Sequence, residues 1–138
     1  METVSINFIA VLLAAVSNMV IGAVWYSPML FGKQWSSLMG YKDKDIPKMQ
    51  EEAKTGYAVM FIVSIISAYV MAHFVQYLGI STAQEAATFG FWIWLGFVGA
   101  VQVSDHVWNG KPMQLLYINT SYRLVSTIAM ALILTMWV

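Results

Sequence analysis

The chain has 138 residues, of which 59% are hydrophobic and only 10% are charged. Soluble domains carry about 25% charged residues, so this composition indicates an integral membrane protein. Seven basic residues balance seven acidic ones, which argues against a nucleic-acid partner, and the lack of cysteine excludes disulfides, thiolate chemistry and cysteine-ligated metal sites.

Four segments are long and apolar enough to cross a lipid bilayer, which needs about 20 residues at 1.5 Å each. They cover residues 4–27, 57–78, 86–108 and 113–138. We therefore expect a single all-α membrane domain over residues 1–138. It should be a four-helix transmembrane bundle with a cytoplasmic or interfacial helical loop at 28–56.

The loop after the first span is expected to contain its own helices. Pro28 ends the first span, because the residue before a proline is pushed out of the helical region. The apolar residues that follow have the spacing i, i+4, i+7, i+8 of a short interfacial helix: Phe31, Trp35, Leu38 and Met39. Gly40 should end it, and Asp45 with Pro47 should begin a helix that runs through residues 48–54 into the second span. The loop is either a solvated connector or a binding or gating element.

The lysines predict the orientation of the bundle. Five lie in the loop after the first span, one lies after the third span, and none lies in residues 79–85. Loops rich in lysine stay in the cytoplasm, so both termini should lie outside.

Arg123 is the most unusual residue, because it lies roughly ten residues inside the fourth span. A charge near the bilayer centre costs roughly 2.5–3.5 kcal/mol on insertion scales, so it needs a partner or a wet cavity.

Helical spacing places polar residues on one face of three spans: Asn18 in the first, Gln102, Asp105 and His106 in the third, and Asn119, Tyr122, Arg123 and Ser126 in the fourth. Arg123 is predicted to pair with Asp105, directly or through Gln102 or Asn119. These polar residues form either a buried lock between helices, a solvated pathway or ligand site, or a partner contact.

Small residues predict close helix contacts. Gly96 and Ala100 form a small-xxx-small pair, which serves packing within the chain or a homo-oligomer equally well. Two isolated histidines argue against a metal site, and Ser104, Asp105 and His106 are consecutive, so they lack the geometry of a catalytic triad. We expect no cofactor and no enzyme activity.

Two stretches resemble a known family. Residues 18–28 (NMVIGAVWYSP), followed by Leu30–Lys33 and Trp35, are similar to the opening signature of small bacterial membrane proteins catalogued as domain of unknown function 1761. Residues 109–112 and 116–119, with Tyr122, resemble its closing part. The resemblance implies a multi-helix bacterial membrane protein without an established activity. It marks as architectural the positions Asn18, Tyr26, Pro28, Trp35, Asn119 and Tyr122.

Two functions follow from these observations. The first is a homo-oligomeric carrier or channel for a small ion or solute in the bacterial inner membrane. Its lining would be Asn18, Gln102, Asp105, Asn119, Tyr122 and Arg123. The second is a structural or accessory membrane protein whose polar cluster only fixes helix packing.

Overall fold

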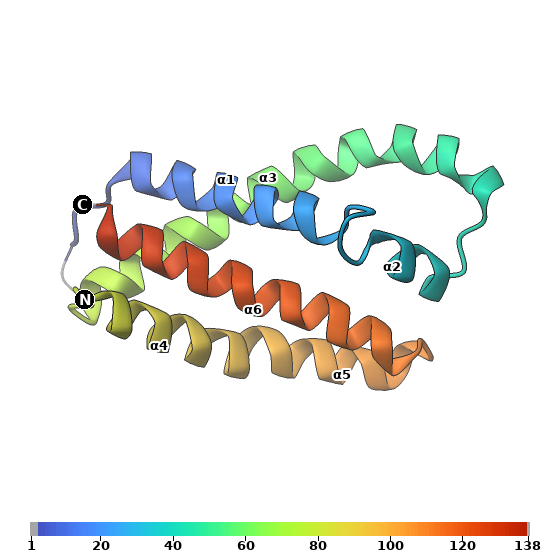
Figure 1. The fold of residues 1–138 in the computed structure, drawn as a ribbon. Coiled ribbons are helices and arrows are strands. Elements are labelled where there is room, and N and C mark those ends of the chain that lie inside the picture. Colours follow the sequence, from blue (N-terminus) through green and yellow to red (C-terminus); the bar gives the residue numbers. More distant parts are fainter. Residues whose placement is uncertain (1–2, 138) are drawn as a thin grey trace.

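The computed structural model describes residues 3–137, and these form helices and connecting turns with no strand. Four helical stretches within this range are long and apolar enough to cross a membrane, as the composition predicted (Figure 1). The first, second and fourth spans are α1 (Phe8–Trp25), α3 (Ile46–Tyr77) and α6 (Met113–Met136). The third span is built from α4 (Ala83–Ile93), η2 (Trp94–Gly99) and α5 (Ala100–Asn109).

Helix α1 is shorter than the predicted segment 4–27, because local side chains fix both of its ends. The Asn7 side chain accepts hydrogen bonds from the backbone amides of Ile9 and Ala10, at 3.0 and 3.2 Å, and so caps the first turn. The helix ends at Trp25, and the Ser27–Pro28 turn that follows leads the chain out of the bundle.

The loop after α1 contains the expected short helix, α2 (Gly32–Leu38), and Gly40 follows it with a φ of 81°. A short turn of 3-10 helix, η1 (Asp43–Asp45), then leads into α3. Helix α3 begins at Ile46 and runs without a break through residues 48–54 into the second span, as predicted. Pro47 suits the first turn, and the charged residues that follow have high helix propensity.

The third span is not a regular α-helix. Residues Trp94–Gly99 adopt π-helical geometry, which neither the composition nor the periodicity predicted. The span makes its close approach to α6 at Gly90, where a Cβ atom would lie 2.9 Å from the Cα atom of Ile128. Gly96 and Ala100 are both exposed instead, so this small-residue pair makes no close helix contact within residues 3–137.

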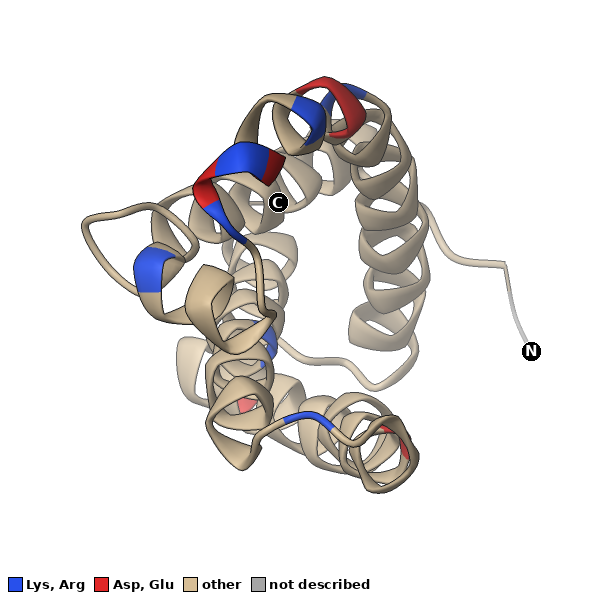
Figure 2. Ribbon diagram, turned by 90° about the vertical axis from the view of Figure 1, so that its right-hand side faces the viewer, with Lys and Arg blue, Asp and Glu red and all other residues tan. Residues whose placement is uncertain are grey.

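Helix α6 is the centre of the bundle and the most buried span, in contact with α1, α3, α4 and η2. The two described ends of the chain lie at the same end of the bundle, as an even number of spans requires (Figure 1). The apolar core fills the half near these ends and includes Ala14, Ala68, Ala86, Ala131 and Leu134. Lysine residues lie toward the opposite end, along α2, η1 and the start of α3 (Figure 2).

Candidate functional site

The largest group of buried polar side chains surrounds Asn18, which is only 3% exposed. Its side-chain amide donates to the Ser64 hydroxyl on α3 at 2.6 Å. Its carbonyl oxygen Oδ1 accepts from the Tyr122 hydroxyl at 2.9 Å and from the Ser126 hydroxyl, both on α6. We call these four residues the Asn18 cluster.

The Asn18 cluster is a closed hydrogen-bond network. The Ser64 hydroxyl, which accepts from Asn18, donates to the backbone carbonyl of Met60 at 2.7 Å. The Tyr122 hydroxyl also lies 3.0 Å from the backbone carbonyl oxygen of Asn18. Each hydroxyl therefore gives its proton to an acceptor inside the bundle. Because unsatisfied polar groups are costly in an apolar medium, this arrangement fixes the rotation of α1, α3 and α6 relative to one another.

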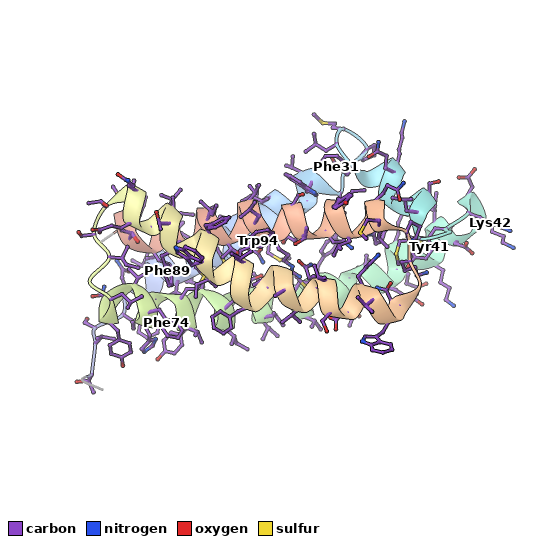
Figure 3. All side chains as sticks on the ribbon, turned by 90° about the horizontal axis from the view of Figure 1, so that it is seen from below. Phe31, Tyr41, Lys42, Phe74, Phe89 and Trp94 are labelled. Atoms are coloured by element: carbon purple, nitrogen blue, oxygen red, sulfur yellow. The ribbon has the colours of Figure 1, made fainter. Side chains whose placement is uncertain are left out.

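Aromatic side chains form a second polar layer, closer to the lysine-rich end. The Tyr26 hydroxyl donates to Asn119 Oδ1 at 2.7 Å, and the indole nitrogen of Trp25 donates to the backbone carbonyl of Ile118 at 3.0 Å. Trp94, at the start of the π-helical segment, donates to the carbonyl of Thr120 at 3.0 Å where the third span crosses α6 (Figure 3). Tryptophan suits such positions because its ring fills apolar space while its N–H finds a partner.

These contacts also fix the level of Arg123. They place the end of α1 beside Ile118 and Asn119, although α6 already begins at Met113. Arg123 therefore lies only four residues, about 6 Å, beyond the level at which the shortest span ends. Its side chain leans back toward the start of α6, as helical side chains do. Arg123 nevertheless lies near the middle of its own helix, α6 (Met113–Met136), so its depth in a membrane stays a prediction.

The predicted pair between Arg123 and Asp105 is not formed. Within residues 3–137 the ion pair that forms is the exposed one between Lys48 and Glu52, at 3.9 Å. Asp105 lies exposed on α5. The half-buried guanidinium of Arg123 lies instead 5.1 Å from the centre of the Tyr122 ring.

The other predicted site residues separate into two groups. Asn18 and Tyr122 meet in the Asn18 cluster, and Asn119 binds Tyr26 in the aromatic layer. Gln102 joins neither group: its Oε1 atom is buried and has no hydrogen-bond partner in the described chain, and the same holds for Oγ1 of Thr120. Across residues 3–137, no cluster of three or more His, Asp or Glu residues is arranged to hold a metal ion.

The residues marked as architectural have clear roles. Trp35 contacts Tyr26 edge to face, with ring centres 5.8 Å apart, and Pro28 follows directly in the turn out of α1. No sequence pattern singles out Ser64, because α3 also carries Ser67 in the same apolar run. Only the packing of α3 against α1 identifies Ser64 as the partner of Asn18.

A family model described as a protein of unknown function, DUF1761, matches residues 9–135. The chain belongs to the DUF1761 family. The match covers every described contact of the Asn18 cluster and the aromatic layer, and all four spans almost completely. The family assignment supports a membrane protein and brings no activity with it. Comparison with curated proteins and with solved structures gives no match.

Proposed function

We propose that this DUF1761 protein is a structural or accessory membrane protein whose buried polar residues hold its spans in one arrangement. The observation that carries the proposal is the closure of the Asn18 cluster. Asn18 and Tyr122, two of the residues expected to line a pathway, bind each other and two serines. A solute passing this point would have to compete with hydrogen bonds that are already satisfied.

The placement of Arg123 supports the same proposal. The Arg123 guanidinium lies over the Tyr122 ring, and a long basic side chain can extend toward the membrane interface. It then needs neither an acidic partner nor a water-filled pathway through the bilayer. The proposal involves no catalytic step; it places the protein in a bacterial inner membrane, with both termini outside as the lysine distribution favours.

A flux measurement on proteoliposomes tests this proposal. We expect the wild-type protein to give no flux of chloride, sodium or protons above that of empty vesicles. Flux that is lost in Arg123→Gln and kept in Lys54→Gln, a matched loss of one positive charge on the exposed surface of α3, would overturn the accessory role.

A homo-oligomeric carrier for a small ion or solute is the second candidate. It is favoured by the buried Oε1 of Gln102 and Oγ1 of Thr120, which lack partners within the described residues, and by the half-buried guanidinium of Arg123. A site with one fixed positive charge would prefer anions. Four spans are few to enclose a pathway and also pack against one another, so a carrier would be an oligomer. The mass of the protein in detergent or nanodiscs therefore distinguishes the candidates. A strict monomer contradicts the carrier.

A further inference from the structure

A groove of about 630 Å³ lies between α2 and the start of α6, outside the Asn18 cluster and the aromatic layer. Helix α2 contributes Lys33, Gln34 and Ser37 to it, and α6 contributes Gln114 and Tyr117. Leu38 and Ile118 supply its apolar part. The groove therefore combines one cation and several uncharged polar groups with an apolar surface, and no carboxylate lines it.

The groove wall formed by α2 is held in a fixed position by the turn before it. Gly32 lies so close to that turn that a Cβ atom there would be 2.4 Å from the backbone oxygen of Tyr26. The amide of Gly32 donates to the carbonyl of Ser27 at 2.9 Å, and the amide of Phe31 donates to the carbonyl of Trp25 at 3.0 Å. Lys33 follows Gly32 directly, so its backbone is placed by the same contacts.

The groove also lies at a defined level along the bundle. Ile118, which lines it, is the residue whose carbonyl receives the hydrogen bond of Trp25 at the end of α1. The apolar span of α1 ends at this level. One end of the groove therefore lies beside apolar helix surface, and its other end lies beside exposed polar residues. Phospholipids place a charged phosphate above apolar chains at this level of a membrane.

We propose that this groove binds an anionic phospholipid. Lys33 would contact the phosphate, while Gln34, Ser37 and Gln114 would donate hydrogen bonds to headgroup oxygens, and Leu38 and Ile118 would contact the upper part of an acyl chain. Charge complementarity supports this occupant, because Lys33 makes no ion pair within residues 3–137. The apolar part of the groove distinguishes a lipid from free phosphate, because an acyl chain would gain binding energy there and a phosphate ion would not.

Native mass spectrometry of the detergent-solubilised protein, titrated with dioleoyl phosphatidylglycerol or dioleoyl phosphatidylcholine, tests the proposal. We expect phosphatidylglycerol to bind several-fold more tightly than phosphatidylcholine. Lys33→Gln should weaken phosphatidylglycerol binding about 5-fold, the effect of one basic residue near an anionic lipid. Lys33→Arg, which keeps the charge, should bind like the wild type.

Lys54→Gln is the matched control, since it removes the same charge from an exposed position on α3 outside the groove. An equal loss in Lys33→Gln and Lys54→Gln would show diffuse attraction only, and would overturn the site. An unchanged affinity in Lys33→Gln would also overturn it. Displacement of the bound lipid by millimolar inorganic phosphate would show that the groove takes a free anion, against the proposal. Because Lys33 is exposed, circular dichroism should show equal helix content in all variants.

Discussion

Asn18 is the side chain on which the packing of three helices depends. One amide group on α1 binds a serine on α3 and both a tyrosine and a serine on α6. Interhelical hydrogen bonds in membrane proteins contribute about 0.6 kcal/mol each on average, but a partner left buried and unpaired costs more. Replacing the central residue of such a network therefore affects every member.

Asn18→Ala is expected to lower the free energy of unfolding by about 2 kcal/mol, because it leaves the hydroxyls of Ser64, Tyr122 and Ser126 without their common partner. The measurement is reversible unfolding in mixed detergent micelles. Ser17→Ala is the matched control, since within residues 3–137 the Ser17 hydroxyl bonds only to the Ala14 carbonyl of its own helix, at 2.7 Å. Its effect should stay within about 0.5 kcal/mol. Equal effects of the two substitutions would contradict a role for the network in stability.

Arg123 and Asp105 are expected to act independently. A double-mutant cycle with Arg123→Gln and Asp105→Asn should give a coupling energy below about 0.5 kcal/mol, because the two side chains form no ion pair and Asp105 is exposed. The same unfolding measurement provides all four stabilities. A coupling above about 1 kcal/mol would show that the two charges meet in the membrane.

Helix α6 and the third span owe their close contact to a single glycine. At Gly90 the backbones approach so closely that a methyl group would press against the backbone of Ile128. The neighbouring small-residue pair at Gly96 and Ala100 has the sequence pattern of a helix contact but lies exposed. The pattern shows that close approach is permitted, whereas the rotation of the helix determines which small residue is used.

Gly90→Ala should therefore destabilise the protein by roughly 1–3 kcal/mol, because the contact atom is backbone and the two helices must move apart. For Gly96→Ala we expect no loss of stability, since a Cβ atom there has no atom within 4 Å in the described chain and alanine favours helix by up to ~1 kcal/mol. Thermal unfolding of both variants in the same detergent checks the contrast. The opposite ranking would mean that Gly96 makes a contact in the membrane that Gly90 does not.

The bundle as a whole is asymmetric along its length. The apolar core fills the half that holds both described ends of the chain, and the lysines lie toward the other end (Figures 1 and 2). This separation agrees with a fixed orientation in the membrane, because lysine-bearing loops remain in the cytoplasm. The long extension of α3 and helix α2 would then face the cytoplasm.

The chain has no cysteine, so single-cysteine variants report this orientation directly. A cysteine at Gln50 is expected to react with a membrane-impermeant maleimide only after the cells are opened. A cysteine at Gln84, in the first turn of α4 at the opposite end, should react in intact cells. Both positions are exposed, so a difference reflects sidedness and not burial. The reverse pattern of labelling would place the lysines outside.

The sequence alone was sufficient to determine four membrane helices, the short helix after the first span and the continuation of residues 48–54 into α3. In lipid every backbone polar group must bond within its own segment, so length and hydrophobicity decide where helices form. The sequence was also sufficient to show that some residues are unusual for a membrane helix: Asn18, Asn119, Tyr122 and Arg123. It did not predict the π-helical segment, which begins at Trp94, where the third span bonds to α6.

Which polar groups meet was decided by the tertiary structure. The sequence predicted a pair between Arg123 and Asp105, but Asp105 is exposed on α5 and the two side chains form no ion pair. Asn18 met Ser64 and Ser126 because of the rotation and axial offset of three helices, and neither quantity is contained in the hydrophobicity of any one segment. The lipid environment requires each segment to be helical, while side-chain packing between segments sets their relative height and rotation.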